Sequence, residues 1–342
     1  MPSIAMTFAL RVAAAAFALA ACTGDDGQRT YPFGPFEIAT HQEITSSCTQ
    51  ITLNNQEAAY VTSVELTTGP GFHHSNWFFV PESVFYGDDG TFRCSDRSFN
   101  EAVAATLGGV LFAQSTQSPH EVQAFPPGVA IRVPPRSKLV ANLHLLNPDD
   151  SVVRVTPTIK LTTVPPAEVV TQLSAISFED HALGLPSNKQ SRFTVECDLA
   201  PIHNQLYHRD PDFKMYYGLA HYHTLGTSLT LEAIRPDGSA AMVFATSHRA
   251  GDTLGGPIDP MFDMAGFTKL RFSCNYFNPR QDTVGWGVGD QEMCVFLAFS
   301  DSLSNWGGGA VQDEPPGEPT IIDNGIMSYT HPCQLLTIDA QH

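Results

Sequence analysis

The sequence predicts an all-β protein built from antiparallel β-sandwiches. Most segments alternate apolar and polar residues, or run apolar for a few residues, between turn signals, as strands of sandwiches do. Helical periodicity is scarce, and only residues 99–111 are compatible with a short helical turn. The chain also holds 25 prolines and 26 glycines among 342 residues, which favours many short strands over long helices.

Individual segments support this fold class. Residues 152–156 alternate as a strand does, and the alternation resumes at residues 158–161 after Pro157. Residues 228–232 and 241–244 flank the turn Pro236-Asp237-Gly238, a pattern typical of a β-hairpin. The stretch from Gly307 to Pro319 is rich in Gly, Pro and acidic residues, so we expect an exposed loop there.

The chain is long enough for two medium-sized domains. Val164-Pro165-Pro166 provides the expected boundary, which divides the folded part into residues 41–164 and 165–342. No sequence repeat relates the two halves. We therefore predict two consecutive sandwiches rather than one repeated unit.

The N-terminus is typical of an exported protein. Arg11 precedes the apolar residues 12–20, a run too short to span a bilayer permanently, so residues 1–21 are interpreted as a signal peptide. This run ends in Leu-Ala-Ala-Cys, which resembles the lipobox of bacterial lipoproteins and predicts lipidation of Cys22. Residues 22–40 would then form a tether, polar at its start. The expected location is a cell-envelope membrane, held through the lipid anchor only; the alternative is an ordinary secretory signal with a chance cysteine.

Charge and cysteine content narrow the functional classes. A formal net charge of −17 without clustered Lys and Arg argues against a nucleic-acid partner. Six cysteines remain besides Cys22, and an even number in an oxidising compartment predicts three disulfides, with fifteen pairings open. Several free buried thiols are the alternative. The chain has no CxxC pair, which disfavours a zinc ribbon.

Thirteen histidines include three places of interest. His73 and His74 are adjacent, so they share a metal only if the backbone bends, which the preceding Gly69-Pro70-Gly71 permits. His144 stands alone in an apolar strand, where a hydrogen-bonded core histidine is the usual interpretation. His221 and His223 alternate along a strand, which places both rings on one face, roughly 6–7 Å apart. That last pair suits one metal ion but does not identify the metal.

A methionine distinguishes between the metals. Met293 follows the glycine-rich residues 285–289 and precedes Cys294, and on a strand the two side chains point to opposite faces. A thioether is a soft ligand that suits Cu(I) better than zinc or non-haem iron. By itself, Met293 is compatible with ordinary core packing.

Taken together, these pieces resemble a family. The order His-His, single His, His-x-His and Glu-Met-Cys, spread from about Cys48 to Cys333, is similar to the copper type II, ascorbate-dependent monooxygenases. Peptidylglycine α-hydroxylating monooxygenase and dopamine β-monooxygenase belong to that family. The most specific parts are residues 221–226 and 292–294.

The resemblance implies two jelly-roll-like sandwiches with one copper ion on each. His73, His74 and His144 would hold the first, electron-transfer copper, and His221, His223 and Met293 the second, catalytic one. It also implies the disulfides Cys48–Cys94, Cys197–Cys333 and Cys274–Cys294. The expected activity is hydroxylation of a C–H bond in a small-molecule substrate with dioxygen and ascorbate or another one-electron reductant.

The substrate residues of the peptide-amidating branch are not present. Where that branch has a carboxylate-binding arginine before the His-x-His pair, this chain has Leu219, and Val295 and Leu297 follow the methionine. We therefore expect a less polar substrate and no peptide amidation. The remaining histidines are interpreted as surface or structural: His41, His120, His181, His203, His208, His248, His331 and His342.

Two rival interpretations differ in class. The first is a lipoprotein that stores or delivers copper without turnover, and the second is a structural surface protein whose sites are vestigial or hold zinc. A classical serine hydrolase is disfavoured because no GxSxG motif is present, and P-loop and dinucleotide-binding fingerprints are absent too.

Overall fold

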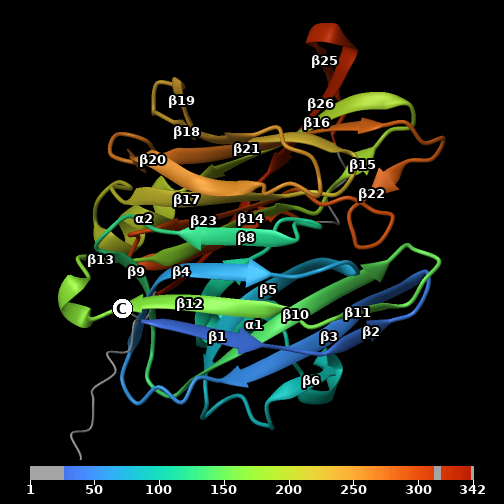
Figure 1. Cartoon of the computed structure of the whole chain (residues 1–342). Coiled ribbons are helices and arrows are strands. Elements are labelled where there is room, and N and C mark those ends of the chain that lie inside the picture. The colour runs from blue at the N-terminus through green and yellow to red at the C-terminus, as the bar shows by residue number, and fades with distance from the viewer. Residues whose placement is uncertain (1–26, 312–316, 340–342) are drawn as a thin grey trace, which may run out of the picture.

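The computed structural model describes residues 27–311 and 317–339 (Figure 1). The predicted signal peptide, Cys22, the start of the tether and His342 lie outside these ranges. Within them the protein is all-β with mainly antiparallel sheets, which confirms the predicted fold class. The jelly-roll connectivity stays a prediction.

The first half of the chain forms two principal sheets. One has the order β1-β12-β4-β9-β13 with β8 added to β4, and the other has the order β6-β3-β10-β5-β7. The strands of this half are β1 (Gln28–Pro32), β2 (Phe36–Ile38), β3 (Gln42–Thr52), β4 (Ala59–Thr67), β5 (Phe72–Pro81), β6 (Gly90–Arg93), β7 (Gly109–Ala113), β8 (His120–Ala124), β9 (Val129–Val133), β10 (Ser137–Asn147), β11 (Val153–Val155), β12 (Thr158–Val164) and β13 (Thr171–Gln172). Its helix α1 covers Glu101–Leu107, and single 3-10 turns occupy Cys94–Arg97 and Pro166–Glu168.

The second half repeats this two-sheet plan. Its sheets have the orders β20-β17-β23-β14-β24-β27 and β19-β18-β21-β16-β26-β25. The elements are β14 (Ser174–Asp180), β15 (Gly184–Leu185), β16 (Lys189–Asp198), α2 (Ala200–Tyr207), β17 (Lys214–His221), β18 (Gly226–Ile234), β19 (Ala240–Thr246), β20 (Gly255–Asp263), β21 (Lys269–Asn278), β22 (Val284–Gly285), β23 (Val295–Ser300), β24 (Ser304–Ala310), β25 (Thr320–Ile322), a 3-10 turn (Asp323–Gly325), β26 (Ile326–Pro332) and β27 (Gln334–Asp339). The two halves lie one above the other in Figure 1.

Apolar side chains join the two halves. The core of the first sandwich includes Tyr217, Leu219 and Phe299, which belong to β17 and β23 of the second. The ring of Phe299 packs edge-on against Phe125, with centroids 5.5 Å apart. Burial of this shared apolar surface holds the halves together and brings one sheet of each against the other.

Two expected boundaries shift in the structure. The tether predicted for residues 22–40 is too long, because β1 pairs with β12 and β2 pairs with β11 inside the first sandwich. The predicted domain boundary at residue 164 is too early, because β13 pairs in parallel with β9. The chain passes to the second sandwich between Gln172 and Ser174.

The loop predicted for residues 307–319 is also corrected. Gly307 to Ala310 belong to β24, a strand between β14 and β27. Gly309 has φ 143°, and a Cβ there would stand 1.7 Å from the carbonyl oxygen of Glu179. Glycine therefore permits the two strands to approach closely here. Composition alone had suggested that this segment is a loop.

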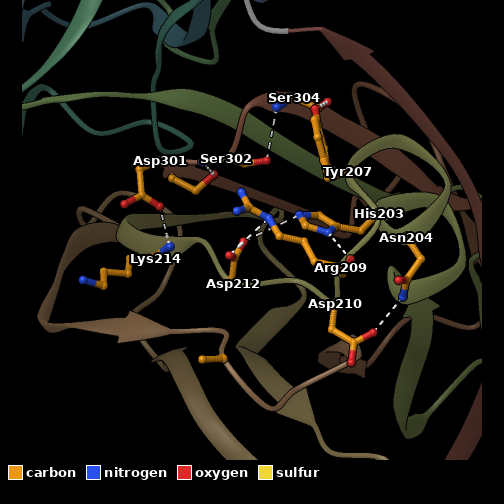
Figure 2. A network of polar contacts seen from close by, with 12 residues as sticks. His203, Asn204, Tyr207, Arg209, Asp210, Asp212, Lys214, Asp301, Ser302 and Ser304 are labelled. Atoms are coloured by element: carbon orange, nitrogen blue, oxygen red, sulfur yellow. Dashed lines mark hydrogen bonds and ion pairs between the residues drawn. The ribbon is translucent and has the colours of Figure 1, made fainter.

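A helix that the sequence analysis did not predict, α2, follows β16. His203 on α2 is buried; its Nδ1 lies 2.8 Å from the carbonyl oxygen of Arg209, and its ring stacks on Trp306. Figure 2 shows the surrounding polar contacts, including the ion pair between Arg209 and Asp212. The network anchors a loop, which agrees with the structural role expected for His203. Among the described residues, no helix is long and apolar enough to cross a bilayer.

Candidate metal centre

A β-bulge allows two adjacent histidines to face one side. His74 is opposite His144 in the β5–β10 pairing, but the next pair is Phe72 with Leu145, so His73 is an extra residue in β5. An extra residue re-aims side chains that would otherwise alternate. Gly71, at φ 81°, precedes the bulge, and a Cβ there would meet Ile38 at 2.7 Å. The local bend required by the sequence analysis therefore exists.

His144 completes the group on the first sandwich. The ligand atoms of His73, His74 and His144 lie within 4.8 Å of one another, a spacing that allows all three to bind one metal ion. Nε2 of His144 lies 2.8 Å from Oε1 of Glu43. Because a carboxylate oxygen only accepts, Nε2 carries the hydrogen and Nδ1 keeps its lone pair.

His221 and His223 are held at the end of β17. Glu292 is 1% exposed, and its carboxylate accepts hydrogen bonds from the backbone N–H groups of His223 and Leu225 at 2.8 and 2.7 Å. Nδ1 of His223 donates to the carbonyl oxygen of Gln291 at 2.7 Å. The ring centroids of the pair are 5.4 Å apart.

A residue of the first sandwich orients His221. Thr116 Oγ1 donates to the carbonyl oxygen of Tyr222 at 2.9 Å and lies 3.2 Å from Nδ1 of His221. With its hydrogen used, the hydroxyl accepts from Nδ1–H, which leaves the lone pair of His221 on Nε2. The orientation of this ring therefore depends on how the two halves dock.

The five histidines form one cluster. The rings of His74 and His221 are 4.6 Å apart, and those of His73 and His223 are 5.3 Å apart. Within the first half, His73 and His144 are 4.3 Å apart. Ring contacts between the halves are thus comparable in distance to those within one half.

Each histidine keeps one buried ring nitrogen without a hydrogen-bond partner. These atoms are His73 Nδ1, His74 Nδ1, His144 Nδ1, His221 Nε2 and His223 Nε2. Buried polar atoms normally have hydrogen-bond partners. Five unpaired ring nitrogens in one place therefore point to a group that accepts their lone pairs, as a metal ion does. Imidazole nitrogens together with a thioether form a donor set that fits copper.

Electrostatics keep the cluster uncharged. Burial, with smaller contributions from the neighbouring His144 and His223, lowers the pKa of His73 to about 3. Burial likewise holds the pKa of His74 and of His221 well below the ordinary value, with smaller contributions from adjacent histidines. Neutral rings have free lone pairs at physiological pH, so protons do not compete with a metal ion.

Met293 lies in the wall of the same cavity as His74, His144 and His221. It precedes β23 in a loop, so the expectation that it lies on a strand is corrected. Two constraints hold it instead: the Cys274–Cys294 disulfide and a hydrogen bond of 2.5 Å from the Tyr276 hydroxyl to the carbonyl oxygen of Met293.

All three disulfides implied by the resemblance are present. They join Cys48 to Cys94, Cys197 to Cys333, and Cys274 to Cys294. Disulfides of this number persist in oxidising compartments, which indicates an exported protein.

A cavity of about 720 Å³ adjoins the histidine cluster. One wall comes from β5, β7, β10 and α1 of the first sandwich, and the other from β14, β17, β23, β24 and β27 of the second. Leu219, Val295 and Leu297, which stand where the amidating branch has polar residues, all line it. His181, expected to be structural or exposed, also lines it, with its ring 4.1 Å from that of Trp286.

Several residues around the site were missed by sequence reasoning. Glu43, Thr116 and Glu101 carry no motif, because their roles depend on contacts far along the chain. Glu292 was noted only as part of the Glu-Met-Cys sequence. The other expected structural histidines behave as predicted where described: His331, for example, is buried and bonded to Asp180 through Nδ1 at 2.8 Å.

Comparisons with known proteins found distant structural similarities. A scan against models of protein families found no match, and a search of curated proteins found none. Among solved structures, PNGase F, a glycosylasparaginase from Flavobacterium meningosepticum, is 8% identical, with 82% of this chain and 97% of that chain covered and a TM-score of 0.35. A protein of Parabacteroides distasonis described as secreted is 9% identical, covering 81% and 90% of the two chains with a TM-score of 0.20. Likenesses this distant carry no argument about the site.

Proposed function

We propose that this protein is a copper-dependent monooxygenase that hydroxylates a C–H bond of a small, largely apolar substrate with dioxygen and an external reductant such as ascorbate. The observation that carries the proposal is the group of five buried ring nitrogens without partners, beside Met293. A hydrolase or a purely structural sandwich has no need for five uncharged, converging imidazoles.

The residues divide into two ligand sets. His73, His74 and His144 would hold one copper ion, and His221, His223 and Met293 the other. When bound, copper supplies the one-electron chemistry and oxygen activation that protein side chains lack.

The rest of the chain positions these groups. Glu43 and Thr116 hold the tautomers of His144 and His221, and Glu292 fixes the backbone at His223. The cavity, lined mainly by apolar side chains, would hold the reacting carbon beside Met293 and His221.

The test is copper content and oxygen uptake of the purified chain, in wild type and in Met293→Ala. We expect two copper ions per chain and ascorbate-driven oxygen uptake in the presence of apolar substrates. Met293→Ala should lower uptake at least tenfold, because the catalytic copper loses its soft ligand. Met242→Ala, at an exposed methionine of β19, is the matched control and should leave uptake unchanged.

Other outcomes favour the rivals. Two copper ions with no uptake across a broad substrate panel would favour a copper-storing protein, and no copper after reconstitution would favour a structural one.

We also propose lipid anchoring through Cys22, on the basis of the Leu-Ala-Ala-Cys sequence. Cys22→Ser should release the protein from the membrane fraction. Unchanged membrane association in that variant would contradict the anchor.

A further inference from the structure

The cavity has a second polar feature besides the histidines. Glu101, the first residue of α1, lines the cavity, and its carboxylate accepts hydrogen bonds from Asn142 Nδ2 at 2.6 Å and Asn76 Nδ2 at 3.1 Å. A carboxylate can accept about four hydrogen bonds, so two acceptor positions remain. Neither the metal ligands nor their supporting residues use this group.

The strand register places this carboxylate next to the metal centre. In the β5–β10 pairing, His74 is opposite His144 and, two residues further along, Asn76 is opposite Asn142. All four side chains line the cavity, so they form successive rungs on one face, roughly 7 Å apart. Glu101, which is bonded to the two asparagines, therefore lies about one residue pair further along the strands than His74 and His144.

On the opposite wall, the strand pair β17–β23 presents mainly apolar side chains at the same spacing. Across β17 and β23, His221 is opposite Val295 and Leu219 is opposite Leu297. Phe78, Val110 and Phe112 add apolar surface from the first sandwich. A ligand reaching from the histidines to Glu101 thus contacts apolar side chains of both sandwiches, and Ser177 and Glu179 on the neighbouring β14 add polar groups beside them.

The cavity lining contains no lysine or arginine among the described residues. It contains a second carboxylate, Glu179, paired with His181 at 2.5 Å. Burial raises the pKa of Glu101, and the Glu179 charge raises it further, although the two asparagine amides lower it. In the metal-free chain, a ligand carboxylate or phosphate would find no lysine or arginine here, whereas a hydrogen-bond donor would use the acceptor positions that remain on Glu101.

We propose that this cavity binds an elongated apolar molecule that carries no negative charge and ends in a hydrogen-bond donor, which Glu101 accepts. The inference rests on the monooxygenase proposed above, because it names the substrate class of the same cavity. Glu101 is the group that sets the position of the ligand, and so selects which carbon lies beside Met293.

The experiment measures binding without turnover. Dodecylamine, dodecan-1-ol and dodecanoate, below their micellar concentrations, are titrated calorimetrically into the purified chain with and without copper. In the copper-free chain, where no metal ion can bind the amine or the carboxylate directly, we expect the amine and the alcohol to bind at least tenfold more tightly than the carboxylate. Butylamine should bind at least tenfold more weakly than dodecylamine, because it gains little apolar burial.

Two variants test the geometry. Glu101→Gln should weaken the binding of dodecylamine at least tenfold more than the binding of dodecan-1-ol. Glu57→Gln, at an exposed site, is the matched control. Leu297→Trp should weaken the binding of all three ligands, because the larger side chain fills space beside the apolar wall. Val152→Trp, on the surface, should leave their binding unchanged.

The proposal is overturned if dodecanoate binds as tightly as the other two, if none of the three binds, or if Glu101→Gln leaves the amine affinity unchanged. Copper loading and oxygen uptake are measured separately, so the enzyme proposal and this one can fail independently. If the probes bind but the chain takes up no copper, the proposed ligand class stands and the monooxygenase does not. If the chain shows turnover but binds no probe, the monooxygenase stands and the proposed ligand class does not.

Discussion

The hydroxyl of Thr116 links one sandwich to His221, a proposed metal ligand of the other. It bonds Tyr222 and His221, and it leaves the lone pair of His221 on Nε2. Partners of this kind commonly change metal affinity by about 10- to 100-fold when removed. Neither the Glu43 contact nor the Gln291 contact joins the two halves in this way.

We predict that Thr116→Val weakens copper binding at the second ligand set by about tenfold or more. The valine keeps the shape of threonine but removes the hydroxyl that accepts a hydrogen bond from Nδ1 of His221. A competition titration with a Cu(I) chelator measures the effect, and the melting temperature of the metal-free chain reports any general loss of stability. Thr320→Val, at an exposed position of β25, is the control; equal copper affinity in both variants would remove Thr116 from this role.

At the scale of elements, the segment from β7 to β8 carries polar contacts between the halves. Ser115 Oγ accepts from the backbone N–H of Leu254, and the Thr116 carbonyl accepts from Gly251 N–H, each at 2.8 Å. Ser115 is in turn held by Glu121 on β8, whose two carboxylate oxygens accept from its N–H and hydroxyl at 2.7 Å. Glu121 thus supports the loop that presents Thr116.

We predict that Glu121 makes stability depend on pH. Burial outweighs the opposing hydrogen bonds from Ser115 and raises the pKa of Glu121 from 4.5 to about 7. The folded chain therefore holds this proton more tightly than the unfolded chain, and the contribution is fully present below pH 4.5 and is lost as pH rises through 7. The shift corresponds to about 3 kcal/mol.

Denaturant unfolding between pH 4.5 and 8 measures this effect. The free energy of unfolding of the wild type should fall with rising pH relative to Glu121→Gln, which cannot ionise. Glu57→Gln, at an exposed site, should track the wild type. Parallel pH profiles for wild type and Glu121→Gln would show that Glu121 titrates normally.

At the scale of the whole molecule, the docking of the halves decides how near the two ligand sets lie. The shared apolar surface around Tyr217 and Phe299 holds β17 and β23 against the first sandwich. As a result, the two ligand sets meet in one chamber that opens into the cavity rather than standing apart.

We predict magnetic coupling between two bound Cu(II) ions. Ring centroids 4.6 and 5.3 Å apart across the halves place the two sets in contact. The electron paramagnetic resonance spectrum of the doubly loaded chain should be broadened and should integrate to fewer than two spins. His144→Ala, loaded with a single ion, should give one full spin. Two unbroadened, independent spins would mean that the halves stand apart in solution.

The sequence alone determined the fold class, the types of donor and their order along the chain. Strand alternation and turn residues are local properties, so they predicted the sandwiches. The strand expected to carry both His221 and His223 ends at His221, so contacts with Glu292 and Gln291 place His223 instead. These local properties did not predict α2 or the strand character of residues 307–310, because glycine favours a loop unless a close strand approach requires it.

Only the tertiary structure decided where the donors meet. The bulge at His73 arises from a mismatch between two strands, and the contacts of Thr116 and Glu101 join segments that are far apart in sequence. Likewise, the expected boundary and tether were displaced because β1, β2 and β13 take partners in the first sandwich. Pairing between strands and packing between sheets depend on the whole chain, so no local pattern of residues contains them.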